Sequence, residues 1–289
     1  MSVILNGKII AESLRDEIAS QTARFRSAGV APKLAVVMVG DDPASALYAK
    51  AKERACQKTE IDFQLFNFPT GAPETTVVDL IRRLNQDNSV HGIMVELPLP
   101  PGLDKKSVLG AVAPIKDVDG VHPVNRGLLL SGGDGLFPVT PQSCIEIILR
   151  SGLAIAGKHA VLIGRGETVG KPLVFMMLGQ NATVTVCHTK TPDLGHFARQ
   201  ADIMVVAVGR PNTITGDMIK PGAIVVDAGI NETPSGICGD VNFEQAREVA
   251  GAISPVPGGV GSLTTVLLQK NLLKAVQLQM SQRTDRKYE

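Results

Sequence analysis

Aromatic residues are scarce in this sequence, and tryptophan is absent. Phe, Trp and Tyr together make up 3% of the 289 residues, whereas hydrophobic residues make up 44%. The core is therefore expected to be aliphatic, built from Val, Ile, Leu and Ala, which is typical of buried parallel strands flanked by helices. The length allows two domains or one large one.

Cysteine pairs and an excess of charge of either sign are also lacking. Cys56, Cys144, Cys187 and Cys238 are far apart and form no Cys-x-x-Cys motif, which argues against a zinc ribbon or another metal site and favours a reducing compartment. Lys and Arg number 29 against 28 Asp and Glu, so the net charge is +1. This balance does not favour binding to nucleic acid or to an anionic membrane.

Long hydrophobic runs are missing as well. The apolar start, residues 1–7, is too short for a signal peptide, and no stretch is long enough to span a bilayer. The sequence therefore predicts a cytoplasmic protein.

The hydrophobic periodicity alternates between helices and buried strands in two successive series. In the first series, strands are expected at 34–39, 61–66 and 91–95, and Ser45 is the expected cap of a helix that runs to about Thr59. In the second, strands are expected at 159–163, 183–187, 203–207, 223–227 and near 252. This order implies parallel sheets.

The predicted fold class is therefore α/β, with two α/β domains around a cleft. Residues 1–120, with about 262–280, form the first domain, because the last helix is expected to pack back on it. Residues 140–261 form a second, Rossmann-like domain. A cleft between two such domains is the default place for a ligand.

A glycine loop organises the second domain. Gly164-Arg165-Gly166 follows the strand 159–163 and precedes a helix expected at 169–178. A strand, tight loop and helix N-terminus in this order direct backbone N–H groups and the helix dipole at an anion. The spacing through Gly170 is one residue longer than the usual dinucleotide fingerprint. A tight turn of an ordinary α/β sheet is the alternative.

The tip of the next strand indicates which dinucleotide fits. An NAD site usually has an acidic residue there, whereas this chain has Thr189 and Lys190. Together with Arg165, they favour a ribose 2′-phosphate and hence NADP, with NAD as the alternative. The alternative is that Arg165 and Lys190 are ordinary solvated charges on the surface.

Tyr48 and Lys52 lie four residues apart and so share one helical face. By periodicity alone, such a pair is an ordinary half-exposed helix surface.

Several longer stretches occur in a consistent order and spacing from Asn6 to Leu273. They are Val39–Ser45 with Tyr48 and Lys52, Gly92–Pro100, Lys116–Gly120, Gly164-Arg165 with Val169–Pro172, Val226–Asn231, Gly239–Val241 and Pro255–Gly261. Taken together, they resemble the bifunctional methylenetetrahydrofolate dehydrogenase/methenyltetrahydrofolate cyclohydrolase family, nearly from end to end.

The resemblance implies an enzyme of one-carbon metabolism that serves purine biosynthesis. It would oxidise methylenetetrahydrofolate with NADP and hydrolyse the methenyl product to formyltetrahydrofolate. It also implies a cytoplasmic homodimer whose partners are tetrahydrofolate derivatives. A monofunctional dehydrogenase and a non-catalytic folate- or dinucleotide-binding paralogue stay open as alternatives.

The same resemblance implies roles for individual residues. The catalytic group would be Tyr48, Lys52, Glu96 and Asp119, with Lys52 as the catalytic lysine and Asp119 on the pterin ring. These four would also bind substrate, together with Val95, Leu97, Pro257, Gly258 and Gly259. The cofactor would contact Gly164, Arg165, Gly166, Thr189 and Ile230.

Three pocket positions depart from the family pattern. Glu96 stands where the family usually has glutamine, and a carboxylate there would pair with Lys52 and reduce its ability to accept a proton. The hydrolytic step is therefore expected to be weak, unless Glu96 is neutral and only replaces the hydrogen bonds of glutamine. Gly166 replaces a serine, and Ser262 a proline that begins the last helix. Together they suggest a diverged or specialised member.

Overall fold

The computed structural model describes residues 2–234 and 236–285, which divide into two compact units. The first unit is Met1–Ser13 with Pro138–Thr264, and the second is Leu14–Phe137 with Thr265–Glu289. Each unit contains a parallel sheet with helices, so the predicted α/β class is confirmed. The functional domain bounds and the cleft stay predictions.

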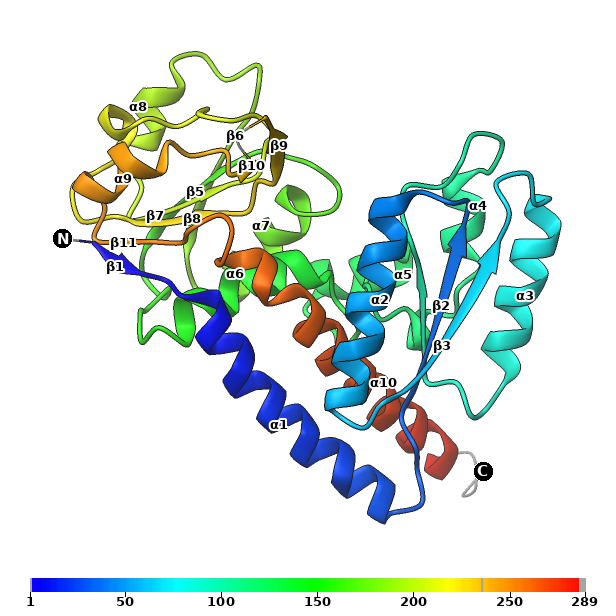
Figure 1. Ribbon diagram of the computed structural model, residues 1–289. Helices are drawn as coiled ribbons and strands as arrows, with labels where there is room; N and C mark the ends of the chain where they lie inside the picture. The colour runs from blue at the N-terminus through cyan, green and yellow to red at the C-terminus, as the bar shows by residue number, and fades with distance from the viewer. Residues whose placement is uncertain (1, 235, 286–289) are drawn as a thin grey trace. The chain divides into compact units, whose positions relative to one another are not determined.

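The first unit is built on a sheet in the order β1-β11-β8-β7-β5-β6, parallel throughout (Figure 1). Its strands are β1 (Val3–Ile4), β5 (His159–Ile163), β6 (Thr183–Cys187), β7 (Ile203–Val206), β8 (Ile224–Asp227) and β11 (Ala252–Ile253). Every residue of β7 is buried. This explains why the central strands read as continuous apolar runs rather than alternating ones.

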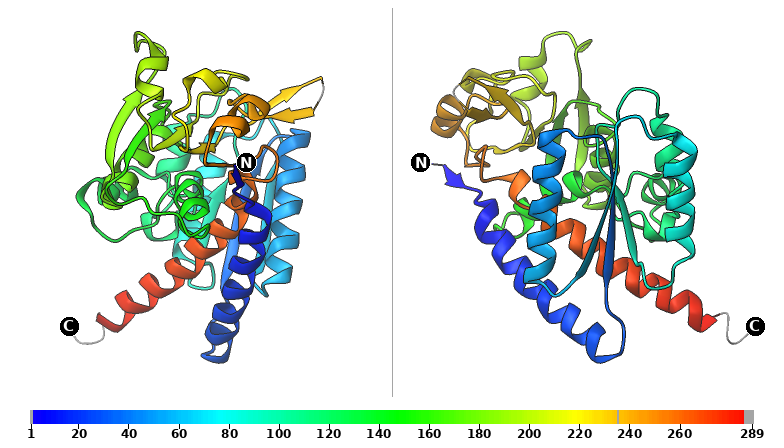
Figure 2. Two further views of the ribbon diagram at one scale, coloured as in Figure 1. Left: turned by 90° about the vertical axis from the view of Figure 1, so that its left-hand side faces the viewer. Right: turned by 45° about the vertical axis from the view of Figure 1, so that its right-hand side comes forward.

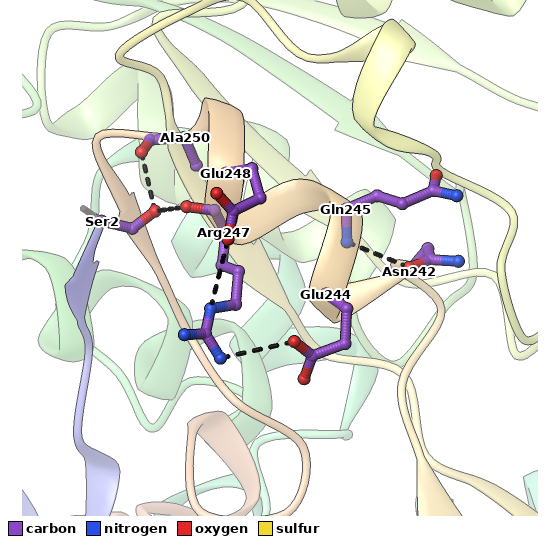
Figure 3. Close-up of polar contacts among 7 residues, drawn as sticks. All are labelled: Ser2, Asn242, Glu244, Gln245, Arg247, Glu248 and Ala250. Carbon is purple, nitrogen blue, oxygen red and sulfur yellow. Dashed lines mark hydrogen bonds and ion pairs between the residues drawn. The ribbon is translucent and has the colours of Figure 1, made fainter.

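Strand β1 did not follow from the sequence pattern, because it has only two residues and their side chains are exposed. Val3 and Ile4 pair in parallel with Ala252 and Ile253. The Ser2 hydroxyl donates to the Ala250 carbonyl at 2.8 Å and also to the Arg247 carbonyl, at the end of helix α9 (Phe243–Val249) (Figure 3). Backbone pairing therefore places this N-terminal strand.

Shorter elements complete the first unit. They are α6 (Val139–Leu149), α7 (Gly170–Gly179), α8 (Leu194–Ala198), η2 (Gly216–Met218), η3 (Val260–Ser262) and the antiparallel pair β9 (Asn231–Thr233) and β10 (Gly236–Cys238). The β9–β10 pair, which the periodicity did not predict, extends away from the six-stranded sheet (Figure 2). The core on one side of that sheet is aliphatic, as expected, and includes Val161, Met204 and Ile253.

The second unit has a three-stranded parallel sheet in the order β3-β2-β4. Its elements are α1 (Gly7–Ser27, which starts in the first unit), β2 (Lys33–Val39), α2 (Pro43–Lys58), β3 (Asp62–Phe68), α3 (Glu74–Gln86), β4 (Gly92–Val95), α4 (Lys105–Gly110), η1 (Pro114–Lys116), α5 (Pro123–Ser131) and α10 (Thr264–Asp285). Helices α2 and α3 lie on either side of β2 and β3 (Figures 1 and 2).

The last helix, α10, packs on the second unit, which confirms the predicted return of the chain. Its buried Gln269 donates to the Thr59 hydroxyl at 3.1 Å, and Asn271 donates to the Val118 carbonyl at 2.8 Å. Buried amide side chains need such partners, so these bonds fix the helix in register. Among the described residues, no helix combines the length and apolar character needed to cross a membrane.

Helix α2 begins three residues earlier than predicted, because Ser45 is not its cap. Pro43 occupies the first turn, where its missing N–H costs no hydrogen bond. The cap is Asp42, whose carboxylate accepts from the Ser45 backbone N–H at 2.8 Å and from the Ser45 hydroxyl at 2.7 Å. These bonds lower the pKa of Asp42.

Candidate active site

Helix α2 presents Tyr48 and Lys52 on one face, as their spacing predicts. The Lys52 Nζ lies 5.8 Å from the centre of the Tyr48 ring. Tyr48 is 55% exposed, whereas the Lys52 side chain is 12% exposed. The tyrosine therefore offers an open aromatic surface beside a largely buried cation.

The partner of that cation is Glu96. The Lys52 Nζ donates to Glu96 Oε1 at 2.8 Å, and the Glu96 side chain is only 6% exposed. Glu96 follows the last residue of β4, Val95, and its backbone N–H donates to the Val37 carbonyl at 2.9 Å. The ion pair predicted from the substitution at position 96 is therefore present, and the sheet holds its carboxylate in place.

Asp119 belongs to the same electrostatic cluster. Its pKa is raised to about 6, mainly by burial and next by the negative charge of Asp117. The cation of Lys52 acts in the opposite direction, and Glu96 adds to the upward shift. A carboxyl group with such a pKa can hold a proton near neutral pH and donate a hydrogen bond to a ligand.

The turn that carries Asp119 is organised by its neighbour, Asp117. The buried Asp117 carboxylate accepts from the His122 backbone N–H at 2.8 Å and from the Asn125 side chain at 2.9 Å. Gly120 completes the turn with a φ of +69°, which favours glycine. Val95 and Leu97 adjoin Glu96 in the chain. The second unit therefore carries its candidate site residues on α2, at the end of β4 and in this turn; they are Tyr48, Lys52, Val95, Glu96, Leu97 and Asp119.

The glycine loop in the first unit has the expected geometry. Gly164 follows β5 with a φ of +119°, and a Cβ there would lie 2.2 Å from the Ala207 carbonyl oxygen. Gly170 begins α7 against this loop, because its Cβ would lie 2.3 Å from the Gly164 oxygen. Both positions therefore require glycine, and Arg165 and Gly166 between them are exposed.

The remaining cofactor candidates lie on neighbouring loops of the same unit. Thr189 and Lys190 are exposed after β6, where Lys190 N–H donates to His188 Nδ1 at 3.1 Å. Ile230 is 59% exposed after β8. Exposed cations beside a glycine loop fit the phosphates of a dinucleotide, so the residue set suits NADP.

The loop that contains Pro257, Gly258 and Gly259 is tied to the N-terminal segment. Gly7 N–H donates to the Gly258 carbonyl at 2.9 Å, and a Cβ on Gly7 would lie 2.0 Å from the Gly259 oxygen. The start of α1 therefore backs this loop, a contact that no local sequence pattern signals.

Two buried aspartates of the first unit were not predicted as individual site residues. Asp227 ends β8 and Asp240 follows β10, and each accepts several backbone hydrogen bonds. Burial raises the pKa of Asp227 to about 6, while three backbone N–H groups oppose the shift. Their only sequence signal is their position in Val226–Asn231 and Gly239–Val241, beside glycines.

Two family models account for most of the chain. The model described as "Tetrahydrofolate dehydrogenase/cyclohydrolase, catalytic domain" matches residues 5–119. The model for the NAD(P)-binding domain of the same enzymes matches residues 138–280. The chain belongs to the tetrahydrofolate dehydrogenase/cyclohydrolase family. The resemblance inferred from the motifs is thereby confirmed.

Individual members of the family are similar over almost their whole length. The bifunctional protein FolD of Pelotomaculum thermopropionicum is 62% identical over 280 residues, which cover 96% of this chain and 99% of that protein. The crystal structure of FolD from Campylobacter jejuni matches with a TM-score of 0.94 and 40% identity, covering 96% of this chain and all of that one. FolD from Trypanosoma brucei, solved with NADP and an inhibitor, matches with a TM-score of 0.90 and 34% identity, covering 96% and 98%.

Proposed function

We propose that this chain oxidises methylenetetrahydrofolate with NADP and hydrolyses the methenyl product, as a member of the bifunctional family. The observation that carries the proposal is the cluster of Lys52, Glu96 and Asp119, which brings a buried cation and two carboxyl groups together beside the exposed Tyr48. Such a cluster, on a chain matched by both family models, fits a folate site with proton-handling groups.

The first reaction, the oxidation, requires no strong general acid or base from the protein. It removes a hydride from a carbon between two nitrogens, and a nitrogen lone pair stabilises the resulting cation. The nicotinamide, when bound, accepts that hydride. The protein's part is alignment, for which Tyr48 supplies an exposed aromatic surface and Asp119 a hydrogen-bonding group.

The second reaction adds water to the methenyl carbon and opens the ring, so it requires proton transfer. Lys52 is the group to accept or relay that proton, but its Nζ is engaged in an ion pair with Glu96 at 2.8 Å, which hinders that role. The geometry therefore supports a hydrolytic step slower than the oxidation.

Dinucleotide binding is assigned to the loops of the first unit. Gly164 allows close approach of the backbone, and the exposed Arg165 and Lys190 supply positive charge for a 2′-phosphate. Gly166 offers no side chain to this site, so Arg165 carries more of the preference for NADP.

Two absorbance assays on one preparation test the proposal. Reduction of NADP with methylenetetrahydrofolate measures the first step, and decay of the methenyl chromophore measures the second. We expect a measurable first step that is faster with NADP than with NAD, and a slower second step. Absence of dinucleotide reduction with either cofactor would contradict the proposal.

We also propose that the chain forms a homodimer through β3. This seven-residue strand pairs with β2 and forms one edge of its three-stranded sheet. Leu65 on it is 41% exposed, and Phe63, Phe66 and Phe68 are half-buried. Long apolar edge strands pair readily with another chain. Sedimentation velocity should show a dimer that Leu65→Lys converts to monomer, whereas Leu149→Lys, at an equally exposed leucine, leaves it intact. A wild-type monomer would refute this.

A cytoplasmic location fits the state of the cysteines. All four are free, and three are buried in the two cores. Burial raises the pKa of Cys56 to about 11 and of Cys144 to about 12, so these thiols are poor nucleophiles. A chain of unpaired cysteines suits a reducing compartment, where a folate enzyme would supply one-carbon units for purine synthesis. Fractionation of cells that produce the protein would test the location.

A further inference from the structure

Asp240 is a fully buried carboxylate that holds a loop by its backbone. It accepts from three consecutive N–H groups, those of Val208 at 2.6 Å, Gly209 at 3.0 Å and Arg210 at 2.8 Å. A fourth hydrogen bond comes from the Asn231 side-chain amide at 2.8 Å. Both carboxylate oxygens are used, close to the full acceptor capacity of the group.

The surrounding backbone is shaped to fit this carboxylate. A Cβ on Gly229 would lie 2.2 Å from the Asp240 carboxyl carbon, so only glycine fits there. A second buried carboxylate, Asp227, accepts from the backbone N–H groups of Asp240 at 3.1 Å and Val241 at 2.8 Å. Asp240 is therefore itself held in place, and the two aspartates belong to one hydrogen-bond network.

The loops that Asp240 joins follow neighbouring strands of the sheet. Residues 208–210 follow β7, and Asn231 lies next to Ile230 after β8, which pairs with β7. The loop after β7 also meets the glycine loop, because Gly164 packs on the Ala207 carbonyl. The carboxyl ends of adjacent parallel strands are where an open α/β sheet binds its ligand. Asp240 therefore supports the edge that carries the cofactor candidates, without being exposed itself.

We propose that Asp240 is a positioning residue for the dinucleotide, fixing the loops after β7 and β8 around it; this inference rests on the proposed function. The role requires a carboxylate specifically. An asparagine of the same shape keeps one acceptor oxygen and turns an NH₂ donor towards N–H groups that need an acceptor. The carboxylate's four hydrogen bonds are then reduced by two, at least one of them from the loop of residues 208–210, and the loop shifts.

The test compares Asp240→Asn with the natural protein and with Asp217→Asn, which alters an exposed aspartate of the same unit. We expect Asp240→Asn to raise the KM for NADP, and the Kd for NADPH measured by its fluorescence, by about tenfold or more. Hydrolysis of methenyltetrahydrofolate, which consumes no dinucleotide, should stay within about twofold, since lost hydrogen bonds in the first unit do not alter Lys52 or Glu96. Asp217→Asn should change neither.

Two outcomes would overturn the inference. One is an unchanged KM and Kd for the dinucleotide in Asp240→Asn. The other is an equal loss of oxidation and hydrolysis, which would show a general role in folding. If Asp240→Asn does not fold, Asn231→Ala removes a single donor to the same carboxylate, and an unchanged KM for NADP there would also refute it. A natural protein that neither binds NADPH nor reduces NADP would instead refute the proposed function.

Discussion

Replacing Glu96 by glutamine should increase the rate of the hydrolytic step. The substitution keeps the shape of the side chain and its hydrogen-bond acceptor, but removes the negative charge that lies 2.8 Å from the Lys52 ammonium. Without that charge, the Lys52 amine is no longer held in an ion pair and is freer to take part in the proton transfer that hydrolysis requires. Oxidation, which needs no strong base, should change little.

The structure sets the size of the effect. Two unit charges 2.8 Å apart attract with about 6 kcal/mol at an effective dielectric constant of about 20. Much of this is offset by the cost of removing two charges from water, because both side chains are largely buried. A remainder of about 1.4 kcal/mol in the barrier to proton transfer corresponds to about a tenfold change in rate. We therefore expect about a tenfold faster hydrolysis near neutral pH, where chemistry limits the rate.

The assay follows the decay of the methenyl chromophore, with NADP reduction measured on the same preparation. Glu53→Gln is the matched control, because it makes the same chemical change at an exposed position one residue from Lys52. Thermal unfolding of each variant separates a change of rate from a change in the folded fraction. Equal hydrolysis by Glu96→Gln and the natural protein would refute the reasoning, and would show that Glu96 acts as a neutral hydrogen-bonding group.

Two other substitutions test the two units separately. Because burial raises the pKa of Asp119 from 3.8 to about 6, the folded state binds more protons between those values, and stability should fall as the pH rises through this window. Asp119→Asn should remove the share of that decline that comes from Asp119, gaining about 2 kcal/mol at pH 7 in denaturant unfolding, with loss of activity. Asp227, whose pKa is also raised to about 6, keeps its own share; an unchanged pH profile of stability would contradict this. In the first unit, Gly164→Ala places a Cβ 2.2 Å from the Ala207 oxygen at a φ of +119°. It should weaken NADPH binding at least about tenfold and lower the melting temperature, since the loop must move. Gly179→Ala, at the end of α7 where a Cβ meets no neighbour within 4 Å, is its control, and equal affinities would refute the steric argument.

The candidate residues of the second unit could be predicted from the sequence because they lie in short local patterns. Tyr48 and Lys52 share a helical face by spacing alone, and the strand that ends before Glu96 is an unmistakable apolar run. The pairing of Lys52 with Glu96, however, came only from the family resemblance. Periodicity assigns a face to a side chain, but it does not say which distant residue lies opposite.

The α/β class, the central strands, the glycine loop and the family could be predicted from the sequence, because each depends on hydrophobic period, turn residues or motif order. The contacts between distant segments became visible only in the folded chain. The fold places Ser2 against Ala250, Gly7 against Gly259, and the Asp240 carboxylate under three amides of the loop after β7. These contacts depend on backbone groups, which every residue carries, so no pattern in the sequence predicts them. The ion pair of Lys52 with Glu96 and the raised pKa of Asp119 likewise depend on burial and on neighbours that only the fold brings within reach.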